Sequence, residues 1–366
     1  MKIRAAVARS PRDDFHIETL DLSDIQPDEI LVRITATGLC HTDLAVRDQM
    51  LPFPLPAVLG HEGAGIVEAV GTEAEGLTPG DRVVLGFAAC RNCPQCDNGQ
   101  PAYCEQFTAL NFGGHRPDGS TCLHSGTETI SSHFFGQSSF ASYAVVSARN
   151  AVKIPDDVPL EIMGPLGCGI MTGAGSVFNA LHMQAGESLL VTGAGPVGLS
   201  AVMAAAAIGA GTVIISDPLA SRRDMARELG ATHCLHPNDG PLPDQIRAIL
   251  PKGVSCVLDT SGISNVIEAG AQALATRGRL AMVGVPRSAE ASISLNILHL
   301  LSLGAQICGV TEGNADPKSF LPYLIDLYRA GKFPFDRMIK HYPLDQINQA
   351  IADQHDGKCV KAVLNM

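Results

Sequence analysis

The chain has 366 residues, a mean hydropathy of +0.15 and a formal net charge of -11. This length suits about two domains with a large core. The acidic charge argues against nucleic acid or an anionic membrane surface as a partner. Apolar residues make up 46% and charged residues 17%, which is the balance of a folded protein and not of a disordered one.

The amino-terminal residues 1–7 alternate like a strand and lack the unbroken apolar stretch of a signal peptide. The apolar run at 201–208 is too short to span a bilayer. The eleven cysteines are an odd number, which fits poorly with a disulfide framework. We therefore expect a soluble, cytoplasmic protein that does not enter a membrane.

Up to about residue 155, short β-rich runs are separated by glycine and proline, for example at 29–34, 65–70 and 81–85. Closely spaced strands of this kind predict a compact, barrel-like β domain. The Gly- and Ser-rich stretch at 111–132 is expected to form a long surface loop.

Four cysteines lie within fifteen residues, in the spacing C-x2-C-x2-C-x7-C. This spacing brings four thiolates around one tetrahedral ion, and Zn²⁺ favours such a closed shell. A closed shell leaves no position for substrate, so the ion is expected to be structural. Two disulfides or four free thiols are the alternatives, and disulfides would need an oxidising compartment. The four residues are Cys90, Cys93, Cys96 and Cys104.

From about residue 171 the chain alternates between strand-like and helix-like segments. The strands are expected at 188–192, 212–216, 254–259 and 279–283, with helices at 196–208, 221–229 and 265–275. Such alternation predicts right-handed βαβ units and a parallel sheet.

A Gly-x-Gly-x-x-Gly sequence follows the first of these strands and opens a helix. Gly193 permits a tight turn, Gly195 lets a pyrophosphate approach the backbone, and Gly198 lets the helix pack on the strand. The second strand ends in Asp217, which suits ribose hydroxyls and would repel a 2′-phosphate, so NAD is favoured over NADP. Arg222 lies nearby and weakens this preference. A glycine-rich turn without a ligand is the alternative.

After residue 303 the pattern changes again, with a helix expected near 319–330 and a closing strand at 360–364. We expect this tail to return to the first domain. The expected domains are a catalytic domain at 1–170 and 305–366, with the four-cysteine lobe near 90–104, and a nucleotide domain at 171–304.

Three further pieces of sequence carry a resemblance: Gly38-Leu39-Cys40-His41-Thr42-Asp43, Gly60-His61-Glu62 and Gly167-Cys168-Gly169. Taken singly, each has a plain explanation as a small buried cysteine or a core histidine. Together with the four cysteines and the glycine fingerprint, they resemble the zinc-dependent medium-chain alcohol dehydrogenase family over essentially the whole chain. The runs at 134–141, 165–170 and 327–335 are most similar to the bacterial aryl-alcohol (benzyl alcohol) dehydrogenases.

The resemblance implies an α/β fold, in which a discontinuous GroES-like β-barrel catalytic domain accompanies a Rossmann domain with a doubly wound parallel sheet. It also implies two zinc ions and NAD for each chain. The catalytic ion would be held by Cys40, His61 and Cys168, with a fourth position open to water or substrate.

Four polar residues near these ligands receive catalytic roles from the resemblance. Asp43 is expected to orient the histidine ligand, and Thr42 to take the proton of the alcohol. Glu62 is expected to approach the metal or to set the local field, and His41 to lie near the pyrophosphate. Many relatives carry a histidine three residues beyond the hydroxyl, whereas this chain has Ala45. The proton relay must therefore end in water or in another base.

The resemblance also places side chains at the cofactor and the substrate. The further cofactor contacts are Thr172, Val197, Val283, Val285 and Lys361. The substrate pocket is lined by Leu51, Phe87, Phe134, Phe135 and Val285. An aromatic and aliphatic lining suits a flat apolar alcohol, although each phenylalanine is equally compatible with a plain core position.

The sequence thus predicts an NAD-dependent zinc alcohol dehydrogenase that reversibly oxidises a primary aryl or allylic alcohol to the aldehyde. Geraniol-type terpenoid alcohols or S-hydroxymethyl thiols are the alternative substrates. A non-catalytic, zinc-stabilised NADH sensor is the alternative from another class. The apolar run at 293–303 resembles the segment that joins nucleotide domains in this family, so we expect a homodimer or a homotetramer.

Overall fold

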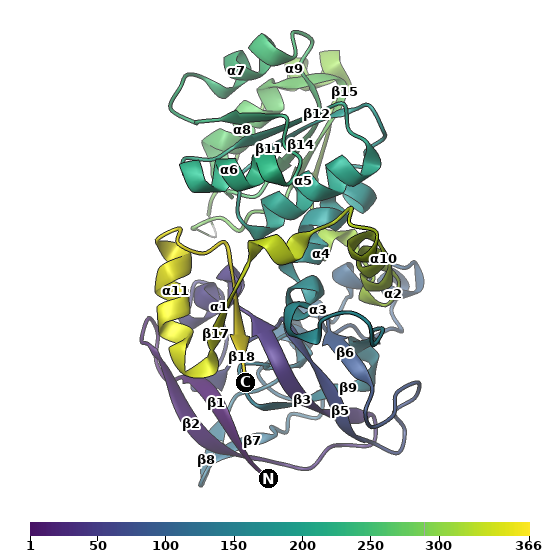
Figure 1. Cartoon of the computed structure of the whole chain (residues 1–366), viewed down its shortest axis with the longest axis vertical. Helices are drawn as coiled ribbons and strands as arrows, with labels where there is room; N and C mark the ends of the chain where they lie inside the picture. Colours follow the sequence, from purple (N-terminus) through teal and green to yellow (C-terminus); the bar gives the residue numbers. More distant parts are fainter. Residues whose placement is uncertain (289) are drawn as a thin grey trace. The chain divides into compact units, whose positions relative to one another are not determined.

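The computed structural model describes residues 1–288 and 290–366, which form two compact units (Figure 1). The first unit comprises Met1–Cys168, Asp316–Leu324 and Met338–Met366. The second comprises Gly169–Ala315 and Ile325–Arg337. Both termini of the chain belong to the first unit.

The first unit is built from two mostly antiparallel sheets. One has the order β4-β1-β2-β7-β8, with β1 at Lys2–Ala8, β2 at Phe15–Leu22, β4 at Ala57–Val58, β7 at Leu123–Ser125 and β8 at Glu128–Ile130. The other has the order β10-β6-β5-β3-β18-β17, and β9 also pairs with β3. Its strands are β3 at Glu29–Gly38, β5 at Gly63–Val70, β6 at Arg82–Leu85, β9 at Tyr143–Ser147, β10 at Ala151–Lys153, β17 at Ile339–Pro343 and β18 at Lys361–Asn365.

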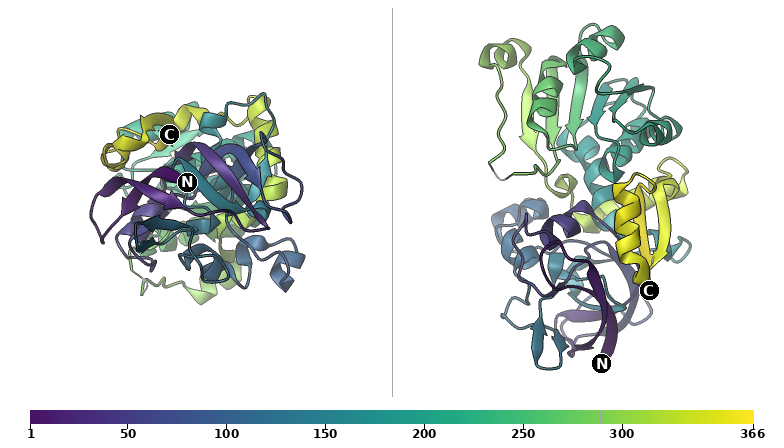
Figure 2. Two further views of the ribbon diagram at one scale, coloured as in Figure 1. Left: turned by 90° about the horizontal axis from the view of Figure 1, so that it is seen from below. Right: turned by 90° about the vertical axis from the view of Figure 1, so that its left-hand side faces the viewer.

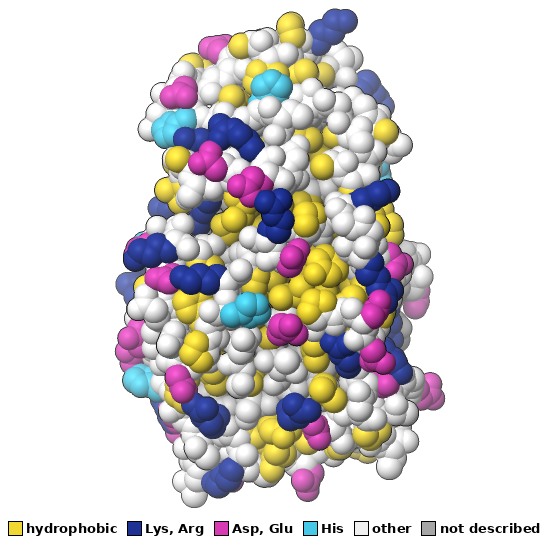
Figure 3. Space-filling view, in the orientation of Figure 1, with side chains coloured by type: hydrophobic (Ala, Val, Ile, Leu, Met, Phe, Trp, Pro, Cys, Tyr) yellow, Lys and Arg dark blue, Asp and Glu magenta, His cyan; other side chains and the backbone are white. Residues whose placement is uncertain are grey.

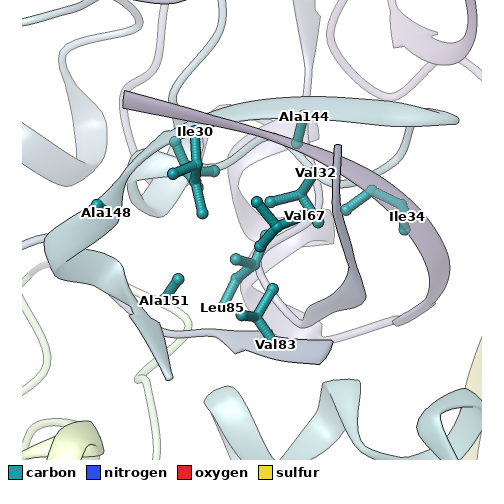
Figure 4. Packing of buried hydrophobic residues seen from close by; sticks show 10 residues of the cluster. Ile30, Val32, Ile34, Val67, Val83, Leu85, Ala144, Ala148 and Ala151 are labelled. Carbon is teal, nitrogen blue, oxygen red and sulfur yellow. The ribbon is translucent and has the colours of Figure 1, made fainter. Parts of the chain in front are cut away.

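Alternation along β3 explains the core of the second sheet. Ile30, Val32 and Ile34 are two residues apart, so they share one face of the strand and are all buried. They pack against Val67 of β5 and Leu85 of β6 (Figure 4). The helices of this unit are α1 at His41–Arg47, α2 at Pro94–Asp97, α3 at Phe107–Phe112 and α11 at Ile347–His355, and α10 at Pro317–Arg329 begins in it.

The second unit contains a parallel sheet of six strands in the order β13-β12-β11-β14-β15-β16. Its strands are β11 at Ser188–Thr192, β12 at Thr212–Ser216, β13 at His233–Leu235, β14 at Val254–Asp259, β15 at Leu274–Met282 and β16 at Gln306–Gly309. Its helices are α4 at Gly169–Gly175, α5 at Pro196–Ile208, α6 at Ala220–Glu228, α7 at Leu242–Ile249, α8 at Ser264–Gln272 and α9 at Ile297–Leu303. Helices cover both faces of the sheet (Figure 2). The reversal of strand order beside β11 is that of a Rossmann fold, which confirms the predicted fold class.

Two expectations need correction. We expected residues from 305 onward to belong to the first domain, but residues 305–315 and 325–337 group with the second unit. The reason is that β16 pairs in parallel with β15 and so extends the parallel sheet. The predicted surface loop at 111–132 instead holds the end of α3, the β7–β8 hairpin and the buried Arg116.

No helix among the described residues is long and apolar enough to cross a membrane. On the face of the molecule in Figure 3, acidic and basic side chains are interspersed, so that face offers no continuous basic surface.

Candidate active site

Four side chains with metal-binding atoms converge within the first unit. One such atom from each of Cys40, His61, Glu62 and Cys168 lies within 4.8 Å of the other three. The pairing of β3 with β5 explains part of this convergence, because the end of β3 lies opposite the start of β5. Cys40 lies two residues after the end of β3, and the His61–Glu62 pair immediately precedes β5. Cys168 joins them from the end of a short 3-10 turn at Gly164–Gly167.

Asp43 fixes the orientation of the His61 ring. Its Oδ1 lies 2.9 Å from Nδ1 of His61 and accepts a hydrogen bond of 3.1 Å from the Gly60 amide. Its Oδ2 accepts a hydrogen bond of 2.8 Å from the Cys40 amide. One buried carboxylate therefore holds both the histidine and the backbone beside Cys40. The sequence interpretation paired Asp43 with the histidine, and the structure adds the two backbone amides.

The donor set fits a zinc ion. Nε2 of His61 is buried and has no hydrogen-bond partner among the described residues, which is costly unless the atom binds something else. A hydrogen bond with Cys168 lowers the pKa of the Cys40 thiol well below its ordinary value, and His61 acts in the same direction. Two sulfurs and one imidazole nitrogen are the donors of a zinc site that keeps a position open for substrate.

Glu62 forms a buried ion pair with Lys361. Its Oε2 lies 2.5 Å from Nζ of Lys361, and that ammonium also donates a 2.9 Å hydrogen bond to the Leu39 carbonyl. Burial raises the pKa of Glu62 to about 7, although Lys361 acts against this rise. We expected Lys361 to contact the cofactor, but its ammonium faces Glu62 in the described structure. A Cβ on Gly38 would lie 1.9 Å from Oε2 of Glu62, so a larger residue there would displace this carboxylate.

The expected proton relay is only partly visible in the first unit. Oγ1 of Thr42 is half-buried and lies 3.7 Å from Sγ of Cys40, which places its hydroxyl beside the metal-binding group. His41 is exposed. Ala45 is buried, with 2% of its surface exposed, and it offers no polar atom to continue a relay. The structure therefore places Thr42 at the group but adds no second base from residue 45.

The four-cysteine lobe has the geometry of a second zinc site. One sulfur from each of the four cysteines lies within 4.8 Å of the others. The sulfurs of Cys90 and Cys96 are 3.9 Å apart, close to the edge of about 3.8 Å expected for a tetrahedron with Zn–S bonds of about 2.3 Å. Backbone amides lower the pKa of Cys93 to about 6. All eleven cysteines are free, so the disulfide alternative is wrong for this structure.

Two adjacent phenylalanines contact the imidazole of His61. Phe135 is stacked on it, with ring centroids 4.5 Å apart and planes 26° apart, and Phe134 meets it edge-on at 5.2 Å. Both phenylalanines are buried in a 3-10 turn at Phe134–Gly136. Three non-glycine residues here have left-handed φ angles: His133 at 60°, Phe135 at 50° and Ser138 at 54°. Each such residue costs about 1–2 kcal/mol, so the surrounding contacts must impose this conformation.

Further rings extend this aromatic wall. Phe112 of α3 lies 5.2 Å from Phe135, and Phe107 lies 6.2 Å from it. Phe53 meets Phe134 at 5.2 Å. Of the predicted pocket residues, Phe87 reaches Phe107 at 5.7 Å, whereas Leu51 is only half-buried and is an aliphatic neighbour of Phe53 in sequence. Phe53, Phe107 and Phe112 were missed because nothing in their local sequence links them to residues 134–135.

The glycine fingerprint of the second unit forms an open cradle. Gly193 has a φ of +99°, and a Cβ on Gly198 would lie 1.9 Å from the Gly193 carbonyl. A Cβ on Gly195 would meet nothing within 4 Å, so this side of the helix start is free for a ligand. Oδ2 of Asp217 accepts a 2.8 Å hydrogen bond from the Ala194 amide, which braces the loop.

The other predicted cofactor residues of the second unit differ in exposure. Val283 follows β15 and is half-buried, and Val285 is 43% exposed. Thr172 is buried on α4, and Val197 is half-buried near the start of α5. Arg222 is half-buried on α6 and donates no hydrogen bond to another described residue from its buried Nε atom. Gly193, Asp217 and Val283 each follow a strand of the parallel sheet, the edge at which such sheets bind ligands.

Two family models match separate parts of the chain. Residues 26–156 match the alcohol dehydrogenase GroES-like domain. Residues 196–329 match the zinc-binding dehydrogenase domain. The first match contains most of the metal-binding group and the whole four-cysteine lobe. The second begins within the glycine fingerprint, after Gly195, and contains Gly198 and Asp217.

Known proteins resemble the chain over its whole length. It is 47% identical to a geraniol dehydrogenase from Castellaniella defragrans, over 99% of this chain and 97% of the relative. The crystal structure of an alcohol dehydrogenase zinc-binding domain protein from Burkholderia ambifaria has a TM-score of 0.98 at 49% identity, over 100% of this chain and 99% of that chain. A benzyl alcohol dehydrogenase from Acinetobacter calcoaceticus has a TM-score of 0.97 at 44% identity, over the same shares.

Proposed function

The chain belongs to the zinc-dependent medium-chain alcohol dehydrogenase family, and on this premise we propose that it reversibly oxidises a primary aryl or allylic alcohol to the aldehyde, with NAD as the hydride acceptor. The stacking of Phe135 on His61 carries the proposal, because it joins an aromatic wall to the metal-binding group. A flat, apolar alcohol packs well on such a wall while its hydroxyl reaches the metal-binding group.

In this proposal Cys40, His61 and Cys168 hold the catalytic zinc, and the four-cysteine lobe holds the structural zinc. A zinc ion bound by the first three residues would act as a Lewis acid on the alcohol oxygen. Asp43 keeps Nδ1 of His61 occupied, so that Nε2 faces the sulfurs. Thr42 receives the proton of the alcohol at Oγ1 and passes it to water, since residue 45 carries no base.

The nucleotide cradle in the second unit supports NAD. The open space at Gly195 and the amides at the start of α5 suit a pyrophosphate. Asp217 has one backbone donor on each carboxylate oxygen, the amides of Ala194 and Leu219, and each oxygen keeps lone-pair capacity for a ribose hydroxyl. Its negative charge disfavours a 2′-phosphate, and Arg222 is the residue that would weaken this preference.

The substrate class is tested by steady-state kinetics with a panel of alcohols and both nicotinamide cofactors. We expect benzyl alcohol and cinnamyl alcohol to give the highest kcat/KM with NAD, and small polyols to give little. Substantial polyol oxidation without benzyl alcohol activity would contradict the proposal. A kcat/KM for geraniol well above that for benzyl alcohol would favour the second candidate, a terpenoid alcohol dehydrogenase, which the 47% identity to a geraniol dehydrogenase supports. A marked preference for an S-hydroxymethyl thiol would favour the third candidate, an S-hydroxymethyl-thiol dehydrogenase.

Metal analysis separates these enzymes from the NADH sensor without catalysis. The enzyme requires two zinc ions for each chain, whereas a sensor stabilised only by the four-cysteine lobe requires one. We also propose a cytoplasmic location, because eleven free thiols suit a reducing compartment.

We further propose that the protein forms a homodimer or a homotetramer through its second unit. Helix α9 exposes Ile297, Leu298 and Leu301, each between 72% and 75%. Strand β16, next to it in sequence, pairs with β15 alone among the described strands and is an edge of the sheet. Exposed apolar side chains beside an open edge favour association with a second copy.

A further inference from the structure

A second group of buried charged side chains lies in the first unit, outside the metal-binding group. Arg116 makes two hydrogen bonds to the carboxylate of Glu29, Nε to Oε1 at 2.7 Å and Nη2 to Oε2 at 2.9 Å. His133 completes the group, with its Nε2 3.5 Å from Oε1 of Glu29. All three residues are at least 90% buried. Burying three titratable side chains is costly, so a group of this kind calls for an explanation.

The group joins three segments that are far apart in the sequence. Glu29 begins β3, Arg116 follows α3, and His133 immediately precedes the turn at Phe134–Gly136. Arg116 also donates a 3.0 Å hydrogen bond to the Asp24 carbonyl, and Ser132 holds Nδ1 of His133 at 2.8 Å. The ring of His133 is therefore held at Nδ1 by a hydrogen bond, while its Nε2 faces the Glu29 carboxylate at ion-pair distance.

His133 is the first residue of a strained turn that ends at Ser138. Left-handed backbone occurs at His133, Phe135 and Ser138, none of which is glycine. Such a conformation persists only where the surroundings impose it, and it is commonly found where a side chain must be aimed. Here the side chain that is aimed is Phe135, which lies flat on His61.

The far end of the turn is anchored separately. Oγ of Ser138 donates a 2.7 Å hydrogen bond to the Val58 carbonyl and accepts one of 3.0 Å from the Phe134 amide. Gln137 donates a 3.0 Å hydrogen bond from Nε2 to the His61 carbonyl. These bonds tie the end of the turn to the backbone around His61. The remaining anchor is the charged group at the start.

We infer that Glu29, Arg116 and His133 are positioning residues, which hold the turn from His133 to Ser138 so that Phe135 stacks on His61 and presents the aromatic wall. One part of the inference rests on the proposed function, namely that the substrate binds against the aromatic wall. None of the three residues contacts the metal-binding group in the described structure; they act through Phe134 and Phe135.

His133→Asn is the main test. Asparagine tolerates left-handed backbone, so the turn is not strained further, but its shorter side chain loses the contact with Glu29. We expect KM for benzyl alcohol to rise at least fivefold, and KM for the small allyl alcohol, which covers less of the wall, to change less than twofold. The kcat for both should stay within about threefold.

A second measurement needs no turnover. With Co²⁺ in place of zinc, the visible absorption bands report the geometry of the ligands, and we expect them to shift in His133→Asn because His61 loses its fixed neighbour. Arg116→Lys keeps a positive charge beside Glu29 but loses the two-pronged contact. Arg116→Lys should raise KM for benzyl alcohol and shift the cobalt bands in the same direction as His133→Asn, but by less. If His133→Asn does not fold, Arg116→Lys tests the positioning role in its place.

The matched control is Tyr342→Phe, which removes a buried 2.8 Å hydrogen bond to Asp353 in the same unit. It should lower the melting temperature without changing the KM ratio or the cobalt bands. Equal losses for both alcohols, unshifted bands, or effects no larger than those of Tyr342→Phe would overturn the inference. If the wild-type protein oxidises no alcohol at all, the proposed function fails. The cobalt bands then decide the positioning role alone.

Discussion

Phe135 lies flat against the imidazole of His61, with ring centroids 4.5 Å apart and planes 26° apart, on a backbone with a φ of 50°. The same phenylalanine contacts Phe107 and Phe112 of α3 on other sides of its ring. It is therefore both a support for a metal-binding residue and part of the surface that we propose for substrate.

Replacing Phe135 with leucine should affect aromatic substrates most. Leucine keeps apolar bulk but removes the ring, and aromatic pairs add about 0.5–1.5 kcal/mol beyond their buried area. We expect kcat/KM for benzyl alcohol to fall about tenfold and that for allyl alcohol to fall less than threefold. Phe320→Leu on α10 is the control, since Phe320 is also buried and packs near Tyr323, with ring centroids 5.9 Å apart, and is not one of the rings of the aromatic wall. Equal losses of kcat/KM in Phe135→Leu and Phe320→Leu would contradict the proposed role of the aromatic wall in substrate binding.

Replacing Asp43 with asparagine should weaken metal binding at the catalytic group. The carboxylate accepts hydrogen bonds from His61 and two backbone amides. Carboxylates that hold a metal-binding histidine in this way commonly contribute about 10- to 100-fold in metal affinity. Competition with a chelator measures the change for the weaker of the two zinc ions. Asp353→Asn is a matched control, because Asp353 also accepts three side-chain hydrogen bonds but lies in α11. An unchanged affinity in Asp43→Asn would contradict the role we assign to it.

Replacing Cys104 with serine should remove the structural zinc. Helix α2 has four residues, none of them buried, so this helix gains little from apolar packing. We expect zinc content to fall from two ions to one for each chain and the melting temperature to drop by several degrees. Limited proteolysis should cut near residues 90–104 first. A matched substitution, Cys256→Ser, removes a buried cysteine of the parallel sheet, outside both groups, and should retain both ions. Two ions in Cys104→Ser would refute the structural site.

The group around His133 should make stability depend on alkaline pH. Burial alone would lower the pKa of His133, but Cys122 and Glu29 raise it to about 9. Protonated His133 therefore contributes stability that is complete below its unfolded pKa of about 6.5 and is lost as the pH rises through about 9.

The effect is measured by denaturant unfolding of wild type and His133→Asn. The difference in unfolding free energy should be about 1–3 kcal/mol at pH 6 and should shrink toward pH 10. At acidic pH the titrating group is Glu29. Burial alone would raise its pKa, but His133 and Arg116 lower it to about 2. The stability that ionised Glu29 contributes is therefore lost only as the pH falls through about 2. The exposed His16, changed to asparagine, serves as control. A difference that does not vary between pH 6 and pH 10 would be inconsistent with this account.

The exposed face of α9 should control assembly. Replacing Leu298 with aspartate places a charge on a side chain that is 75% exposed in the single chain, so the fold should tolerate it. If a second copy covers this face, analytical ultracentrifugation should show a shift toward monomer. Ile263→Asp, at another exposed apolar position, should leave the assembly unchanged. A wild-type protein that is already monomeric would contradict the proposed assembly.

The parts that sequence predicted well are local in the chain. The four cysteines lie within fifteen residues, and Cys40 and Asp43 lie on one turn of chain, so spacing alone relates them. The glycine fingerprint is equally local, and its turn has the expected left-handed residue at Gly193. The parallel sheet followed from the alternation of apolar strands and helices.

The parts that sequence missed depend on contacts between distant residues. Glu29 and Arg116 are 87 positions apart, and Lys361 reaches a carbonyl 322 positions away, so no periodicity or spacing relates them. Strand β16 was assigned to the wrong domain because its four residues, Gln306–Gly309, alternate too briefly to be recognised. The strained turn at Phe135 is also unreadable, since a bulky residue gives no sign of left-handed backbone.

The three hydrogen bonds to Asp43 have a consequence for the order in which the protein folds and takes up its metal ions. They are formed by a backbone that needs no ion, so the pocket for the catalytic metal is finished when the chain has folded. In the cysteine lobe the helix α2 has no buried residue, so the proposed structural zinc would contribute more to holding this segment together. In a cell short of zinc, two forms of the protein would therefore arise. Chains that lack only the catalytic ion would stay folded and could bind zinc later. Chains that never received the structural ion are exposed to degradation.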